Sequence, residues 1–191
     1  MTRKELLALV NAYVAEHFKP KKPTDLYAAS RTSSRRESIE HRAMMKFAVP
    51  SFLTRDFNVD DIVAKNAGET FSQMLLRLVK ESGEKPSTIY KRAEVLRQIY
   101  NRIVNNVNYQ PSKDTAIAFA VALRLDLSAT KKLLSSAGYA LSNAIKRDLI
   151  ISAFIENQQQ LAKSKFFNLS TLNEVLHDCG QDILPKRKDD L

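Results

Sequence analysis

The sequence contains little cysteine, glycine, proline or tryptophan. Its 191 residues include one Cys, four Gly, six Pro and no Trp. A single cysteine excludes an internal disulfide framework and fits a reducing compartment. With few helix breakers, and with few of the alternating β-branched runs that mark strands, most of the chain consists of good helix formers. We therefore expect an all-α fold.

Long apolar runs are also missing. No uninterrupted stretch reaches membrane-spanning length, and the N-terminus lacks the apolar segment of a signal peptide. We expect a cytoplasmic protein with no membrane partner.

The residue patterns of catalytic and metal sites are absent too. His17, His41 and His177 are scattered, and Cys179 has no third or fourth ligand at metal-site spacing. There is no Walker loop, dinucleotide-binding fingerprint or G-x-S-x-G elbow. We expect no enzyme activity, no cofactor and no metal, and we interpret Cys179 as a half-buried structural residue.

Positive charge is in excess. The net charge is +9, and the surplus lies in residues 1–68, with 12 Lys and Arg against 8 Asp and Glu, and in residues 69–160, with 13 against 8. Such a surplus favours a polyanionic partner, either nucleic acid or an acidic membrane surface, although lysine also serves solubility.

The stretch KPSTIYKRAEVLRQIYNRIVN, residues 85–105, is typical of two short helices that meet at a tight corner. Ile89 and Ala93 share one side of the first helix, and Ile99 and Ile103 share one side of the second. The opposite side of the second helix is rich in Arg, Gln and Asn, which make paired hydrogen bonds with guanine or adenine in a major groove. We expect base contacts from Arg97, Gln98, Asn101 and Arg102.

Residues at helix starts and flanking edges are expected to hold the DNA backbone. One such module covers a short half-site, so we expect a homodimer on double-stranded DNA, with half-sites about 34 Å apart. The predicted backbone contacts are Ser87, Thr88, Lys91, Arg92, Asn105, Ser112 and Lys113.

Two segments precede this helical region. Residues 1–18 form an amphipathic helix that begins with a Thr2–Glu5 capping box, and its apolar face suits the main domain, a second copy or another protein. Residues 19–66 form a basic, partly disordered linker. Within the linker, a run of arginines is either a DNA-binding arm or a solvated tether. These arginines are Arg31, Arg35 and Arg36.

Further helices are predicted within residues 67–184. An apolar stripe starts at Phe71 and stops near Gly83, and residues 115–125 are apolar nearly all round. Gly138 ends a fifth helix, and residues 185–191 form a frayed tail. The predicted N-caps of successive helices are Ser112, Ser128, Ser142 and Ser170.

The segments FSQMLLRLVKESG, IYKRAEV, YQPSKDTAIAFAVAL, LLSSAGYALS and TLNEVL resemble a family. It is the repressor-like helical domain at the C-terminus of many uncharacterised bacterial proteins, some of which carry a macro domain. The resemblance covers roughly residues 67–184. It implies a five-helix phage-repressor-like helix-turn-helix domain, here with additional C-terminal helices and an N-terminal helix on a linker. This chain has no room for a macro domain.

Three hypotheses follow. The first is a sequence-specific duplex DNA-binding protein, a transcriptional regulator. The second is a protein-interaction adaptor, favoured by Glu94, which stands at the corner where repressor-like domains usually have glycine or asparagine. The third is an RNA-binding protein, which requires Tyr100 and Tyr109 to point outward.

Overall fold

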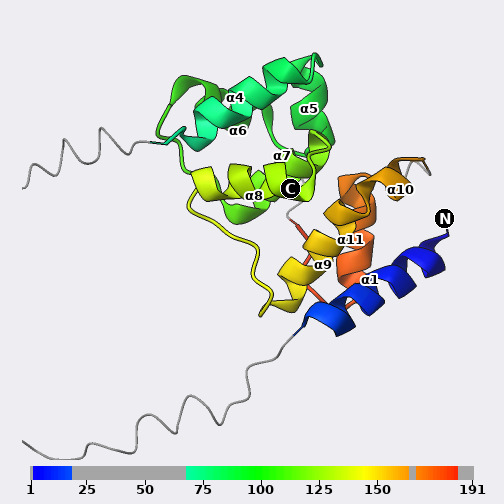
Figure 1. The fold of residues 1–191 in the computed structure, drawn as a ribbon. Coiled ribbons are helices and arrows are strands. Elements are labelled where there is room, and N and C mark those ends of the chain that lie inside the picture. The colour runs from blue at the N-terminus through cyan, green and yellow to red at the C-terminus, as the bar shows by residue number, and fades with distance from the viewer. Residues whose placement is uncertain (1, 19–67, 164–166, 185–191) are drawn as a thin grey trace, which may run out of the picture. The chain divides into compact units, whose positions relative to one another are not determined.

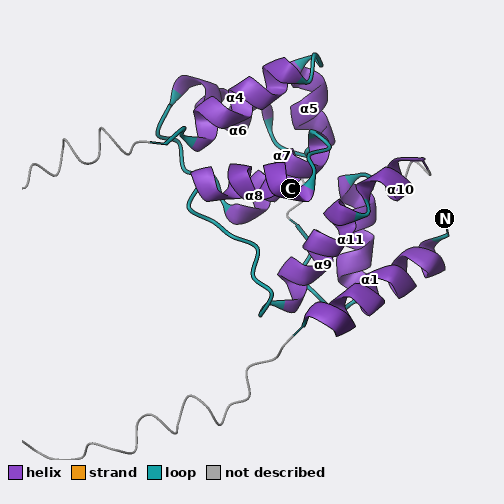
Figure 2. Ribbon diagram, viewed as in Figure 1, coloured by secondary structure: helices purple, strands orange, loops and turns teal. Residues whose placement is uncertain are grey.

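The computed structural model describes residues 2–18, 68–163 and 167–184. These residues contain nine helices and no strand, which confirms the all-α class (Figures 1 and 2). The helices are α1 (Arg3–His17), α4 (Phe71–Glu81), α5 (Pro86–Arg92), α6 (Arg97–Asn105), α7 (Lys113–Ala122), α8 (Leu127–Ser136), α9 (Lys146–Glu156), α10 (Gln158–Lys163) and α11 (Leu169–Asp178).

Several helix ends follow the predicted signals. Thr2 and Glu5 form the expected capping box on α1, and the Ser112 side chain accepts a hydrogen bond from the Thr115 amide at the start of α7. Gly83 and Gly138 adopt positive φ angles of 66° and 73° just after α4 and α8. An L-amino acid with a side chain is strained in that conformation, so glycine stops both helices there.

Three predicted caps are wrong. Asp126 caps α8 in place of Ser128, and Asn168 caps α11 in place of Ser170. Both shifts have the same cause, because Asp and Asn accept the amide hydrogen bond as well as Ser and stand two residues earlier. Ser142 caps no helix, since α9 begins at Lys146 after Ile145, which supplies no side-chain cap.

Two helices are buried on all sides. Every residue from Ala116 to Ala122 of α7 is buried, as predicted for this apolar segment. In α9 the whole run from Asp148 to Ile155 is buried as well, including the polar residues Asp148 and Ser152. Helix α5 and helix α8 pack on α7, and α8, α10 and α11 pack on α9. These two helices are the centre of the core.

Helix α1 docks on the chain's own core. Its apolar stripe of Leu6, Val10 and Val14 is 2%, 0% and 9% exposed, and the helix lies along α9 (Figure 1). Arg3 adds a two-pronged ion pair with Asp178 of α11, the shortest contact being 2.7 Å. Residues 1–18, expected as a segment separate from residues 67–184, therefore belong to the same compact unit, made of Met1–Lys19 and Glu69–Leu191.

None of the helices in the described segments is both long enough and apolar enough to cross a membrane.

Candidate nucleic-acid interface

Helices α5 and α6 are joined by a four-residue corner, Ala93–Leu96. Amide hydrogen bonds fix its path, from Glu94 to the Lys91 carbonyl at 3.0 Å and from Val95 to the Tyr90 carbonyl at 2.9 Å. Ala93 and Val95 are buried beneath the corner. Glu94, which stands where repressor-like domains usually have glycine or asparagine, adopts the left-handed conformation with a φ of 52°. The corner is thus a fixed turn held by backbone bonds and by the core.

The inner side of the helix pair belongs to the core. Ile89 and Ile103 are both 0% exposed, and Tyr100 is 7% exposed. The Tyr100 ring lies 5.5 Å from the Tyr90 ring and 6.3 Å from the Phe119 ring, centre to centre. Burial raises the pKa of the Tyr100 hydroxyl above its usual value. Because Tyr100 points inward and Tyr109 is half-buried, neither offers the open ring face that RNA stacking requires.

The outer side of α6 is polar and unpaired. Arg97, Gln98, Asn101, Arg102 and Asn105 are all exposed. Within the described part of the chain, none of these side chains makes a hydrogen bond or an ion pair, and α6 contains no carboxylate. The four predicted base contacts therefore lie together on one helix face with their hydrogen-bonding groups unused.

Of the four predicted backbone contacts on α5, Arg92 differs from the others because its side chain has partners among the described residues. Thr88 and Lys91 are exposed, Ser87 is half-buried, and the Lys91 ammonium makes no ion pair with any described residue. Arg92 instead donates to the Ala122 carbonyl at 2.8 Å and to both oxygens of Glu84 at 3.1 and 2.5 Å. The hydrogen bond from Arg92 lowers the pKa of the Glu84 carboxyl. The Arg92 side chain therefore links α5 to the end of α7 and is not free to bind a phosphate.

Ser112 and Lys113 are also engaged inside the molecule. The Ser112 hydroxyl caps α7 and lies 2.8 Å from the Thr115 hydroxyl. The Lys113 ammonium donates to both oxygens of the Asp148 carboxylate at 2.8 and 2.7 Å, and that carboxylate is 3% exposed. A buried carboxylate without a cation would be strongly destabilising, so Lys113 is needed where it is. These two predictions of DNA contact are not supported.

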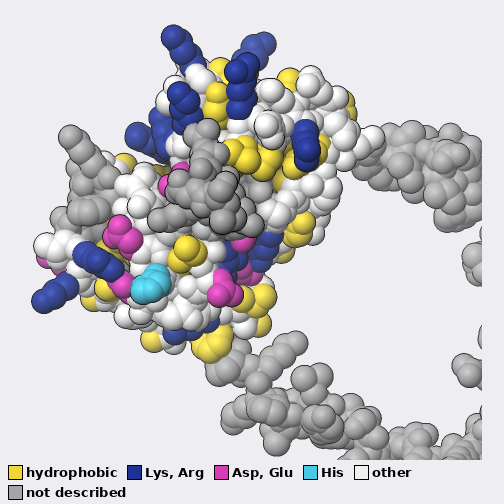
Figure 3. All heavy atoms as spheres, turned by 180° about the vertical axis from the view of Figure 1, so that it is seen from behind, with side chains coloured by type: hydrophobic (Ala, Val, Ile, Leu, Met, Phe, Trp, Pro, Cys, Tyr) yellow, Lys and Arg dark blue, Asp and Glu magenta, His cyan; other side chains and the backbone are white. Residues whose placement is uncertain are grey.

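Positively charged side chains outnumber negative ones in the part of the chain around α6. Residues 69–138 carry 11 Lys and Arg against 6 Asp and Glu. Five of the six carboxylates are in ion pairs or cap a helix, and Glu94 at the corner is the exception among the described residues. In Figure 3, Lys and Arg side chains project from the upper part of the molecule, where α4–α8 lie. The field of these cations would attract a polyanion to this surface.

Two other predicted elements do not add to the interface. Arg31, Arg35 and Arg36, the predicted basic arm, lie outside the described residues. The apolar face of α1 is covered by α9, so it is not open to a second copy or another protein in this structure.

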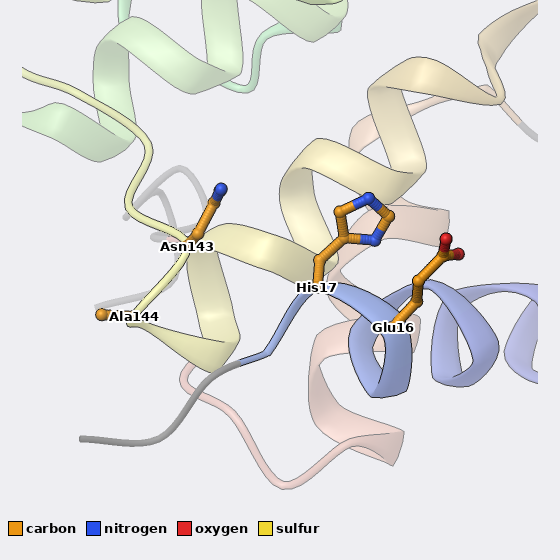
Figure 4. Close-up of a pocket in the computed structure, with 4 residues that line it drawn as sticks. All are labelled: Glu16, His17, Asn143 and Ala144. Carbon is orange, nitrogen blue, oxygen red and sulfur yellow. The ribbon is translucent and has the colours of Figure 1, made fainter.

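Three further features bear on chemistry: Cys179, the possible metal ligands and a pocket beside α1. Cys179 is half-buried, and burial raises the pKa of its thiol, which makes it a poor nucleophile. In the described segments, no three His, Cys, Asp or Glu side chains gather at a distance that would hold a metal ion. An open pocket of about 450 Å³ is lined by Glu16 and His17 of α1 and by Asn143 and Ala144 of the loop before α9 (Figure 4). His17 already stacks on Tyr13 and its Nδ1 lies 3.0 Å from the Tyr13 carbonyl, so the pocket offers no free acid–base pair in fixed geometry.

The chain was compared with known proteins. No protein-family model matches it, and neither a curated protein nor a solved structure is significantly similar.

Proposed function

We propose that this chain is a sequence-specific duplex DNA-binding protein, a transcriptional regulator. In this proposal α4–α8 form a repressor-like domain, α5 and α6 are its helix-turn-helix, and α6 enters the major groove. One observation carries the proposal: the exposed face of α6 holds Arg, Gln and Asn side chains that have no partner among the residues the structure describes, with no carboxylate among them.

The dimensions are compatible. An α-helix with its side chains is about 10–12 Å across, and the major groove is about 12 Å wide. Arg97, Gln98 and Asn101 lie in the first two turns, the end of a recognition helix that contacts base edges. Thr88 and Lys91 would hold phosphates on one side. A contact of this size covers a short half-site, so a homodimer on two half-sites about 34 Å apart is part of the proposal.

The test is a selection from a randomised duplex library with the full chain, followed by fluorescence anisotropy on the enriched duplex and on a scrambled one. Gln98→Ala is expected to weaken binding to the enriched duplex by about 1–3 kcal/mol and to leave the scrambled duplex unaffected. Lys4→Ala, which removes an exposed cation from α1, is the control and should retain the preference. An unenriched library, or a Gln98→Ala variant with full preference, contradicts the proposal.

A second candidate function is a protein-interaction adaptor. Two observations favour it. Glu94 places at the corner a carboxylate that pairs with no described residue and would repel a phosphate, and Val107 is 51% exposed beyond the end of α6. The burial of the α1 face weakens it, because that helix was the expected attachment point for a second partner. Under this second function, Gln98→Ala leaves binding to the protein partner intact.

A further inference from the structure

One aliphatic side chain stands among the polar groups of α6. Val104 is 42% exposed, whereas Ile103 beside it is 0% exposed. Only four large hydrophobic residues of the described part are exposed, and Val104 is the one that lies within a helix; the others are Val107, Ile145 and Ile183.

The position of Val104 places it on the same face as the predicted base contacts. It follows Arg97 by seven residues and Asn101 by three, and this spacing puts the three side chains along one side of a helix. Ile103, in contrast, is directed into the core together with Tyr100. Val104 therefore borders the row of donors that the proposed function assigns to the major groove.

Neither stability nor packing accounts for a valine there. At an exposed helical position, β-branched residues are less favourable than Ala, Lys or Glu, because their side-chain rotation is restricted. At 42% exposure the residue is only partly packed on the core, unlike Ile103. A contact with an apolar group outside the chain would explain it.

We infer that Val104 recognises the 5-methyl group of a thymine, and this inference rests on the proposed function. The thymine methyl is the characteristic apolar group on base edges in the major groove, where the neighbouring groups are hydrogen-bond donors and acceptors. A protein partner with an apolar surface would leave Arg97 and Asn101 desolvated without acceptors, which is unfavourable. A duplex satisfies both kinds of side chain at once, so DNA is the occupant that fits the whole face.

The experiment replaces each thymine of the library-enriched duplex by uracil, one at a time, because uracil lacks only the methyl group. Anisotropy is measured with the full chain, with Val104→Ala and with Val107→Ala. Val107→Ala is the matched control, since it removes the same two methyl groups from the turn after α6. Val104→Ala should fold normally because alanine favours the helix.

The expected result is a loss of about fourfold in wild-type affinity at one thymine, or at its symmetric copies, on replacement by uracil. Val104→Ala should bind the thymine and uracil duplexes equally, while Val107→Ala should still discriminate. If no uracil changes wild-type affinity, or if Val104→Ala still discriminates, the inference is wrong and the proposed function stands. If the library yields no preferred sequence, both fail together.

Discussion

Lys91 and Arg92 are consecutive cations on α5, but only Lys91 has a side chain available to a phosphate. Arg92 donates to Glu84 and to the Ala122 carbonyl. We predict that Lys91→Ala weakens binding to all duplexes alike and reduces the slope of log affinity against log salt by about one, with stability unchanged within about 0.5 kcal/mol. Anisotropy over a salt series and urea unfolding measure the two effects.

The neighbouring variant serves as the contrast. Arg92→Ala removes the hydrogen bond from α5 to the Ala122 carbonyl of α7 and the charge-assisted bonds to Glu84 in the loop before α5, and it should lower the free energy of unfolding by about 1–3 kcal/mol. If Arg92→Ala left stability unchanged and only the salt slope fell, our assignment of Arg92 to the fold would be wrong.

Glu94 combines a strained backbone with a charge that has no ion-pair partner in the described segments. Its φ of 52° is unfavourable for a residue with a side chain, by about 1 kcal/mol. We predict that Glu94→Gly increases the free energy of unfolding by about that amount. Glu94→Gln keeps the strain and removes the charge, so it should leave stability unchanged and tighten duplex binding at low salt by about threefold. If Glu94→Gly and Glu94→Gln had the same free energy of unfolding and the same affinity for the duplex, this separation of backbone strain from charge would be contradicted.

At the scale of single elements, α1 makes a testable contact with the end of α11. The Cys179 Sγ lies 4.0 Å from the Asn11 Oδ1, across a separation of 168 residues. We predict that Asn11→Cys forms an intrachain disulfide with Cys179 on mild oxidation and stabilises the chain by about 3–5 kcal/mol. Mass spectrometry and thermal unfolding of the oxidised and reduced forms measure both effects.

Ala12→Cys is the control, because Ala12 is exposed and stands on the opposite side of α1 from Val10. It should remain a free thiol. Disulfide-linked dimers from Asn11→Cys, in place of an intrachain bond, would show that α1 does not dock as the structure has it.

Tyr13 of α1 makes the stability of the docked helix depend on pH. Burial, followed by the nearby Glu156 carboxylate, raises the pKa of the Tyr13 hydroxyl from 10.0 to about 12. The unfolded chain therefore loses this proton first, so the free energy of unfolding should fall as pH rises from about 10 to 12. Tyr13→Phe should show a shallower fall in urea unfolding across that interval. Identical slopes for the two proteins would mean that Tyr13 is not buried against α9 in solution.

The sequence predicted elements better than the contacts between them. The apolar spacing located α4, α5, α6 and α7, and the corner at Glu94 and the cap at Ser112 are as expected. Several neighbouring residues can cap the same helix, which is why Asp126, and not the predicted Ser128, caps α8.

Ala122, whose carbonyl accepts from Arg92, is 30 residues away along the chain, and Asp148, the partner of Lys113, is 35 residues away. The hydrophobic periodicity of the sequence carries no information on such long-range pairs. The sequence therefore could not distinguish cations that make contacts within the fold from cations that are free. The docking of α1 on α9 could not be predicted for the same reason, since an apolar stripe in the sequence does not specify which surface covers it.

At the scale of the whole molecule, the distribution of paired and unpaired charges supports the account. The chain carries a net charge of +9. Around α6 most carboxylates are already engaged in ion pairs or caps, while Lys91, Arg97 and Arg102 are exposed and make no ion pair with described residues. The surplus of positive charge therefore lies on the surface that would bind DNA. The affinity for DNA should depend strongly on salt concentration.

The most direct test of this account is the affinity of the full chain for duplex DNA over a salt series, measured by fluorescence anisotropy beside Arg97→Ala and Lys4→Ala. We predict tight binding at low salt with a log–log slope of about −3 to −5, a loss of sequence preference of about 1–3 kcal/mol in Arg97→Ala, and no loss of preference in Lys4→Ala. A folded protein that binds no duplex at low salt, or an Arg97→Ala variant that behaves as the wild type, would contradict the claim that α6 is a DNA-recognition helix.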